Sequence, residues 1–583
     1  MKHRSEAKPM NSAESAVLES ATLDEPWALV QSFATYKREH PDDVNRGMDE
    51  VVERLRRHGV KVKVHQPDLF LSLPGAARVE SGGMTFRAKP PACSLDARDG
   101  LTGQLVYIGA NHADNIDTIF DRRLDPNRVT RSEIEGKIVI SEGFASPGMI
   151  SQFEGLGAIG VIGINPGVDI HWGICTTVWG VPDLDDLPRK PNVVSVAVNR
   201  IDGRKLIEIA EAGGEVTLFT EMEEGWYNSK LPEVWIEGSE EPEKYVLLHG
   251  HLDSWDVGVG DNATGDATLL EVARTLWENR DKLKRSVRIA WWCGHSTGRY
   301  AGSTWFADEF AIDLEENCVA QINCDSPGCR WASEFINLSV MSECEPHVAE
   351  VIREVTGKTA VCERPHRAGD YSFNNIGISS FFMLSSTMPA AQREEKGYYA
   401  VGGCGGNIAW HTENDTLEIA DRDNLLRDIK IYALATMRVA NADILPFDWR
   451  RTLDEFLGTI DGYQAKAGAR FDLGPSKSAA EALKTSLDSF YGRIGDGSAN
   501  AVTANNAIHD LARILVPINF CREARFRHDP AVTIPPLPTI ATAAELDRLS
   551  DANLGFARTQ LTRGQNRLVS ALNQARGVVE AAL

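Results

Sequence analysis

The 583-residue sequence lacks long apolar runs and any excess of basic residues. No stretch of 18 or more apolar residues occurs, so we expect no transmembrane helix. The N-terminus, MKHRSEAKPMNSAESAVLES, has no apolar signal-peptide core. A formal net charge of -22, spread along the chain, argues against nucleic acid or an anionic membrane as the main partner. The ten cysteines form no CxxC pair, and we expect free thiols in a cytoplasmic protein.

Four ranges differ in their sequence pattern. Residues 1–20 are expected to be disordered, a helical pattern covers 24–59, and the whole range 1–74 is assigned to the N-terminal part of the catalytic domain. Short β-like runs such as GKIVISE and AIGVIGIN predict a separate β-rich domain over residues 75–220. Residues 221–445 alternate apolar strands with helices, which predicts a mostly parallel sheet covered by helices. Residues 446–583 lack strand patterns and are predicted to form a helical domain.

The stretch HGHLDSWDVGVGDNATG, residues 249–265, follows an apolar strand. His251 and Asp253 stand where that strand gives way to a loop, and Asp261 follows before a predicted helix. Neutral imidazole binds metal ions, and a carboxylate can bind two cations at once. A polar loop with an N-capping aspartate is the other interpretation of this stretch taken alone.

Three more apolar strands or loops deliver residues of the same kind. Asp325 ends the strand in INCDSPG, His295 follows the strand in SVRIAWWCGHSTG, and His411 lies in AWHTENDT. Ligands collect at the carboxyl ends of parallel strands. Since buried charges are costly unless they are paired or bound to metal, the set predicts a metal site.

The order of these motifs resembles the co-catalytic zinc aminopeptidases, in the branch that contains glutamate carboxypeptidase and the transferrin receptor. Two further segments support this resemblance: GKIVISEGFASPGMISQFEGLGAIGVIGIN is similar to the protease-associated domain of that branch, and LARILVPINFCREARFRHDPA to its dimer-forming helical domain. The resemblance implies an α/β aminopeptidase fold of the phosphorylase/hydrolase-like type. It also assigns 75–220 to a protease-associated domain, 221–445 to the metal-binding catalytic domain and 446–583 to a dimerisation domain, so a homodimer is expected.

The resemblance also implies a ligand set. One cation would take His251, Asp261 and Asp325, the second would share Asp261 and take His411, and Asp253 would orient His251. One or two divalent ions are expected, with zinc first and iron or manganese as alternatives.

The sequence departs from the family where two adjacent glutamates are expected, a general base and then a metal ligand. Here the chain reads Trp291-Trp292-Cys293-Gly294-His295-Ser296. Counting from Trp291 places Gly294 at the base and His295 at the ligand, whereas counting from Trp292 places His295 at the base and Ser296 at the ligand. We favour the first register because histidine is the better metal ligand. The general base would then be missing, with Asp370, Glu413 or His295 as its possible replacements.

Other residues are assigned smaller roles. Trp410 occupies the place of a tyrosine that stabilises the oxyanion, and it either donates its indole N–H or packs against the site. Arg299 and Tyr300, within a short insertion, could reach a substrate carboxylate or carbonyl, although such residues are also common at surfaces. Cys293, Cys324 and Cys404 are interpreted as small core residues.

Three functions compete. The first is a metal-dependent hydrolase that cleaves a specialised small amide or a peptide-like substrate, with little ordinary aminopeptidase activity because the base is missing. The second is a different metal reaction on the same scaffold, a lyase, hydratase or iron-type oxidation. The third is a binding protein without catalysis, and the nearly complete ligand set argues against it.

Overall fold

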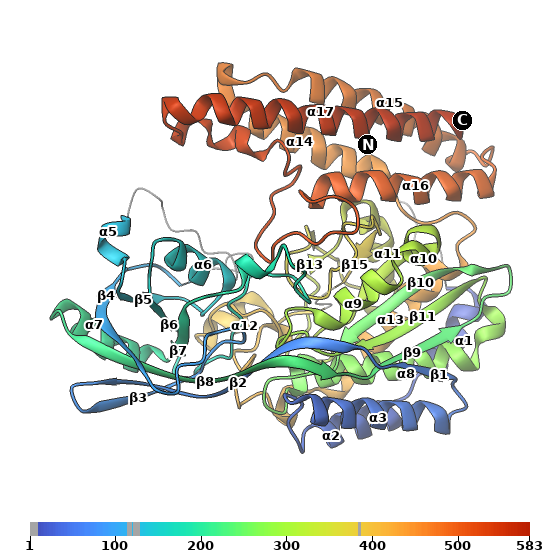
Figure 1. Ribbon diagram of the computed structural model, residues 1–583. Helices are drawn as coiled ribbons and strands as arrows, with labels where there is room; N and C mark the ends of the chain where they lie inside the picture. The colour runs from blue at the N-terminus through green and yellow to red at the C-terminus, as the bar shows by residue number, and fades with distance from the viewer. Residues whose placement is uncertain (1–9, 113–118, 120–128, 383–385) are drawn as a thin grey trace.

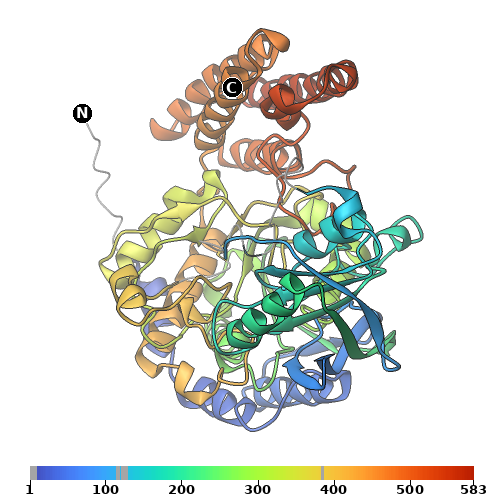
Figure 2. The same cartoon turned by 90° about the vertical axis from the view of Figure 1, so that its left-hand side faces the viewer.

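The computed structural model describes residues 10–112, 119, 129–382 and 386–583. Its ribbon has three parts: a sheet flanked by helices, a second sheet beside it, and a bundle of helices above both (Figure 1). The side view shows the helical bundle projecting from the other two parts at one end of the molecule (Figure 2). The expected α/β architecture with flanking helices and a helical C-terminal region is confirmed.

The larger part is built on a mixed sheet of six strands. The order is β1-β9-β11-β10-β12-β15, and β10, β11, β12 and β15 pair in parallel, whereas β1, β9 and β11 pair antiparallel. The bounds are β1 Val62–His65, β9 Leu231–Ile236, β10 Glu241–His251, β11 Arg285–Trp292, β12 Cys318–Asn323 and β15 Ser380–Phe381. Strands β11 and β12 are buried along their whole length, as expected for parallel strands covered on both faces.

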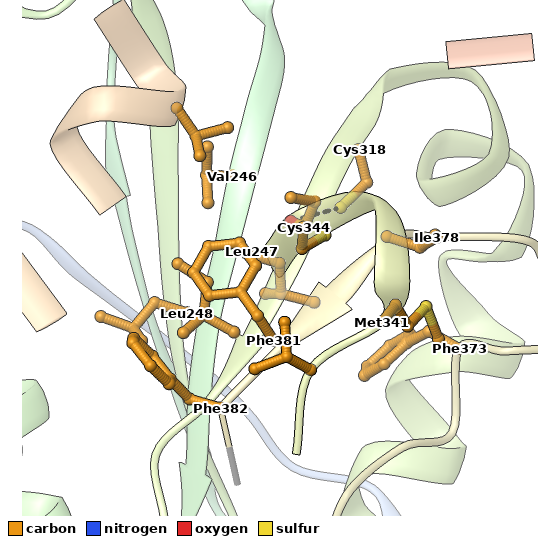
Figure 3. Packing of buried hydrophobic residues seen from close by; sticks show 14 of the residues in the cluster. Val246, Leu247, Leu248, Cys318, Met341, Cys344, Phe373, Ile378, Phe381 and Phe382 are labelled. Atoms are coloured by element: carbon orange, nitrogen blue, oxygen red, sulfur yellow. Dashed lines mark hydrogen bonds between the residues drawn. The ribbon is translucent and has the colours of Figure 1, made fainter. Parts of the chain in front are cut away.

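Helices cover both faces of this sheet. They are α2 Asp24–Phe33, α3 Pro41–Arg57, α8 Thr264–Glu278, α9 Ala301–Glu309, α10 Ala311–Asn317, α11 Glu345–Thr356 and α13 Arg422–Asn441. A shorter helix, α12, spans Ala390–Glu395, and a small pair of strands consists of β13 Leu338–Ser339 and β14 Cys362–Glu363. Figure 3 shows how Val246, Leu247 and Leu248 of β10 lie among aromatic side chains that include Phe381 and Phe382. The strand ends that carry polar residues therefore rest on a tightly packed core.

The second sheet has seven strands in the order β3-β2-β8-β4-β5-β6-β7. Strands β4 to β7 pair in parallel, and β2, β3 and β8 join them antiparallel. The bounds are β2 Asp68–Ser81, β3 Met84–Ala88, β4 Leu101–Tyr107, β5 Ile138–Glu142, β6 Gly160–Ile164, β7 Val194–Val198 and β8 Glu215–Asn228, with α5 Arg131–Ile134, α6 Pro147–Gly155 and α7 Arg200–Glu211. We call residues 68–228 the inserted sheet. Its assignment as a protease-associated domain stays a prediction.

Strands β2 and β8 form a long two-stranded ribbon between the two parts (Figure 1). They pair from Asp68 opposite Asn228 to Glu80 opposite Thr217. The ribbon begins three residues after β1 ends and finishes three residues before β9 begins. The chain therefore passes from the six-stranded sheet into the inserted sheet along β2 and returns along β8.

Four long helices build the C-terminal part: α14 Trp449–Ala467, α15 Gly474–Gly495, α16 Ala501–Phe520 and α17 Asp551–Ala581. Leu561, Leu568, Leu572 and Val579 of α17 are fully buried at helical spacing, which explains why the polar sequence around them folds as one helix. An irregular segment separates α16 from α17, at the place of the proline-rich sequence DPAVTIPPLPT.

The N-terminal expectation is partly wrong. Residues 1–9 lie outside the described residues, but Ser12–Ser20 form a helix, α1. Asn11 and Glu14 form a capping box, and Glu14 pairs with Arg438 of α13 at 3.1 Å. In the part of the chain that the structure describes, no helix is long and apolar enough to cross a membrane. The cysteines are free thiols, as expected.

Candidate functional site

Five predicted residues stand at one edge of the six-stranded sheet. His251 ends β10, His295 follows β11, and Asp325 follows β12. Asp261 lies in the turn Val259–Ala263 that leads into α8, and His411 lies in the loop before α13. Because β10 pairs in parallel with both β11 and β12, the carboxyl ends of these strands meet at this edge.

Asp261 lies between two histidines. Its Oδ1 is 3.2 Å from His251 Nε2, and its Oδ2 is 3.2 Å from His411 Nε2. His251 Nε2 is also 3.6 Å from Asp325 Oδ2. All four residues are buried. Ligand atoms of His251, His295 and Asp325 moreover lie within 4.8 Å of one another, and the His295 ring stacks on His251 with centroids 3.7 Å apart.

The three histidines are held by hydrogen bonds at Nδ1. His251 Nδ1 is 2.8 Å from the carbonyl of Asp253, His411 Nδ1 is 3.0 Å from the carbonyl of Trp172, and His295 Nδ1 is 2.9 Å from Asp370 Oδ2. Each of these oxygens accepts, so Nδ1 carries the proton. The Nε2 atom of each ring is thereby left to bind a cation or accept a proton.

These residues fit a divalent cation. His251 Nε2 and Asp261 Oδ1 are buried 3.2 Å apart, and neither atom forms a hydrogen bond of normal geometry with a described residue. Burial alone would lower the pKa of His251, but the carboxylates of Asp261 and Asp325 outweigh burial and hold the pKa well above its usual value. Carboxylates that attract a proton to Nε2 attract a cation to the same atom, and two imidazoles with two carboxylates form a donor set suited to zinc.

The site lies in a region that matches a known family model. The model of the family "Peptidase family M28" matches residues 234–436. These residues are similar to that family, and we call them the M28 domain. This M28 domain contains every residue of the cluster, and the predicted membership in the zinc aminopeptidase and glutamate carboxypeptidase-like superfamily is confirmed.

Similar proteins cover the chain unevenly. A probable glutamate carboxypeptidase, VP8, of Zea mays is 26% identical over 248 residues, which are 40% of this chain and 34% of VP8. Aminopeptidase NAALADL1 of Mus musculus is 36% identical over 129 residues, 21% of this chain and 16% of that protein. The chain thus spans about a third or less of the length of these relatives.

Solved structures show the same fold. A zinc aminopeptidase from Bacillus subtilis aligns over 75% of this chain and 97% of its own, with a TM-score of 0.53 and 17% identity. A peptidase M28 precursor from Shewanella amazonensis SB2B aligns over 74% and 96%, with a TM-score of 0.54 and 17% identity.

Two residues that the sequence interpretation overlooked hold the candidate ligands in place. Asn262 donates to the carbonyls of His251 and Cys324, both at 3.0 Å. Asp415 accepts the N–H groups of Gly260 at 2.7 Å and of Asp261 at 3.0 Å. Burial, together with the nearby negative charge of Asp261, raises the pKa of Asp415 to about 7. The signal was present, because both residues belong to the motifs DNATG and HTENDT.

The predicted role of Asp253 needs correction. The main-chain carbonyl of Asp253, rather than its carboxylate, accepts from His251, and the carboxylate lies 3.9 Å from His251 Nδ1. The carboxylate accepts instead the N–H groups of His295 at 3.1 Å and Ser296 at 3.2 Å. Asp253 therefore positions the turn after β11.

The backbone at Gly294 argues against the register that placed the missing base there, because a side chain would have no room to enter the cluster. Its φ is +69°, and a Cβ at this position would lie 2.8 Å from Leu71 Cδ2 of β2 and 3.1 Å from Ala301 Cβ. A side chain at 294 would thus point toward β2. The side chain of His295 is the one directed into the cluster.

Asp370 and Glu413 are unsuited to act as the base. Asp370 is fully buried and bonds His295 Nδ1 and Ser303 Oγ; burial would raise its pKa, but His295 outweighs burial and lowers it. Partial burial would also raise the pKa of Glu413, but Lys89 and Arg87 outweigh burial and lower this pKa to about 2. Asp370 instead orients His295, as a carboxylate orients the histidine of a catalytic pair.

Trp410, Arg299 and Tyr300 are all buried. Trp410 stacks on His411 with ring centroids 3.7 Å apart, which favours the packing interpretation. Tyr300 lies with its ring 4.8 Å from that of His295, and its hydroxyl accepts the N–H of Gly369. Arg299 lies over the Tyr300 ring at 4.7 Å and is 1% exposed. Tyr300 thus packs against His295, and both residues of the insertion are buried rather than exposed at the surface.

Proposed function

We propose that this protein is a metal-dependent hydrolase that cleaves an amide bond in a small or peptide-like substrate. The observation that carries the proposal is the buried group His251, Asp261, Asp325 and His411, with both histidines fixed so that Nε2 faces Asp261. A divalent cation held by these four residues would act as a Lewis acid and lower the pKa of water.

His295 is the proton acceptor in this proposal. Its Nδ1 donates to Asp370, whose lowered pKa keeps the carboxylate charged, so Nε2 carries the lone pair. Gly294 offers no side chain, and Glu413 is neutralised by two cationic partners. His295 can therefore take a proton at Nε2 during attack and return it to the leaving amine, as general acid–base catalysis requires.

A second function is favoured by one observation. His295 belongs with His251 and Asp325 to the group whose ligand atoms lie within 4.8 Å of one another. Two histidines and one carboxylate form the facial set that also suits iron. In that case His295 would be a ligand, and the reaction would be a non-hydrolytic metal reaction.

One experiment separates the two functions. The metal content of the purified wild type and of His295→Ala is measured by elemental analysis, and both are assayed on a panel of N-acyl amino acids, aminoacyl amides and short peptides. Hydrolysis with a base at His295 predicts full metal content in the variant and loss of activity. Loss of metal together with activity supports His295 as a ligand, and a metal-free, inactive wild type refutes the hydrolase. His58→Gln, at the end of α3, is the matched control.

A further inference from the structure

The connection between β6 and β7 of the inserted sheet reaches the M28 site. His171 Nδ1 donates to the carbonyl of Trp410 at 2.6 Å. Trp172 donates its N–H to the carbonyl of His411 at 2.8 Å and accepts from His411 Nδ1 at 3.0 Å. We call these two pairs, 171–172 and 410–411, the clamp. Two of these three hydrogen bonds join the inserted sheet to His411, a candidate cation ligand, and the third joins it to the neighbouring Trp410.

The His171 side of the clamp is anchored at three points. The N–H of His171 donates to Asn165 Oδ1 at 2.7 Å, which closes the loop after β6. Since Nδ1 donates to a carbonyl, Nε2 accepts, and the hydroxyl of Tyr399 donates to it at 2.7 Å. The ring of His171 also packs edge-on against Phe144, with centroids 5.0 Å apart. These contacts fix the His171 ring in one orientation, in which Nδ1 faces the carbonyl of Trp410.

The Trp172 side of the clamp is attached to a second part of the site. Its indole stacks on Trp255 with centroids 5.1 Å apart and an angle of 12° between the planes. The indole N–H donates to Asp256 Oδ2 at 3.0 Å. Trp255 and Asp256 follow His251 in the loop toward Asp261, so Trp172 contacts the surroundings of both candidate ligand histidines.

We infer that Trp172, with His171, is a positioning residue of the cation site, so that the inserted sheet sets how tightly the M28 domain holds its cation. The inference rests on the proposed cation site. The Trp172 carbonyl fixes the proton of His411 on Nδ1, and the anchored indole fixes where that carbonyl lies. Groups that orient a metal ligand in this way typically change metal affinity by about 10- to 100-fold when they are replaced.

The test measures zinc affinity directly, by competition with a chromogenic chelator, on the full chain. Trp172→Ala removes the stack and the indole hydrogen bond, and should weaken zinc binding by about 10- to 100-fold. Trp172→Phe retains a stacking ring and should recover most of the affinity. Val168→Ala, at a 62% exposed position of the same connection, is the matched control and should bind zinc as the wild type does.

The visible spectrum of bound Co²⁺ is a second measurement on the same site. Because the visible absorption of bound Co²⁺ depends on ligand geometry, Trp172→Ala should alter the spectrum and Val168→Ala should not. If Trp172→Ala fails to fold, His171→Phe breaks the clamp at its other side chain and should also weaken zinc binding. Folded clamp variants that bind zinc with wild-type affinity and spectrum overturn the inference alone. A wild type that binds no zinc overturns the proposed function as well.

Discussion

The cluster around Asp261 and the turn from Gly294 to Tyr300 lie side by side, yet they are built differently. The cluster is held by partners from the motifs that supply the ligands, such as Asn262 and Asp415. The turn contains three residues with positive φ, Gly294, Arg299 and Tyr300, and rests on distant chain segments. Thr297, for instance, accepts the N–H of Ser72 from β2 at 2.8 Å. The difference teaches that two adjoining parts of one candidate site can depend on supports of different origin, near in the sequence for the cluster and distant for the turn.

The largest effect is expected from Asp261→Ala, which tests the cluster rather than the turn. Asp261 contacts both His251 and His411, so its loss removes the contact common to both candidate ligands. We expect zinc affinity to fall by more than the roughly 10- to 100-fold typical of residues behind the ligands, and activity to be abolished. Zinc titration followed by assay checks this, with the exposed Asp488→Asn as control. Near wild-type zinc affinity would show that Asp261 binds no cation.

His295→Ala tests the turn alone. If His295 is the proton acceptor, kcat should fall by about 10²- to 10⁴-fold with little change in zinc content. His295→Glu returns a carboxylate at the same place and should retain more activity than His295→Ala. Steady-state kinetics on one substrate, with metal analysis of each variant, gives the answer. Equal kcat in His295→Ala and the wild type contradicts the role.

Gly294→Glu distinguishes the two registers. The new side chain would meet Leu71 at a backbone φ of +69°. We therefore expect no gain of activity and a loss of about 1–3 kcal/mol in the free energy of unfolding. Denaturant unfolding and activity assays measure both quantities. A gain in peptide hydrolysis would restore the register that counts from Trp291.

Asp415 predicts a smaller, pH-dependent effect in the cluster. Its pKa in the folded protein is about 7, above the ordinary value of 3.8, so the folded state binds the proton more tightly than the unfolded state. The stabilisation is complete below about pH 3.8 and is lost as the pH rises to about 7. For the metal-free protein, the unfolding free energy relative to Asp415→Asn should fall by up to about 1.4 kcal/mol per pH unit in this window. Chemical denaturation from pH 4 to 8 measures it, and a flat difference would show that Asp415 does not carry a raised pKa.

Much of the cluster could be predicted from sequence because its geometry is local. An apolar strand that ends in a histidine or aspartate is visible in the sequence, and parallel pairing brings such ends together. The same applies to α17, whose buried residues recur at helical spacing. The convergence of His251, Asp325 and the nearby Asp261 follows from these patterns, whereas the aminopeptidase-type fold and the place of His411 in the ligand set were implied by the family resemblance.

The turn could not be predicted in the same way. The direction of position 294 depends on its positive φ and on Leu71, more than 200 residues away in the chain. The partner of His411 is a main-chain carbonyl in the connection between β6 and β7, and no side-chain pattern marks it.

The helix at Ser12–Ser20 was missed for a different reason: its capping box, Asn11 with Glu14, was overlooked among polar residues.

The ribbon of β2 and β8 limits how this architecture can be altered by recombination. Leu71 and Ser72, near the start of β2, contact the turn after β11. The rest of β2 belongs to the inserted sheet. A chimera that exchanges the whole of residues 68–228 also exchanges a support of the turn that carries His295. A chimera cut after Ser72 and before Glu224, its partner in the ribbon, keeps that support with the M28 domain. Grafts of foreign sheets into this chain should therefore be joined part-way along the ribbon rather than at its ends.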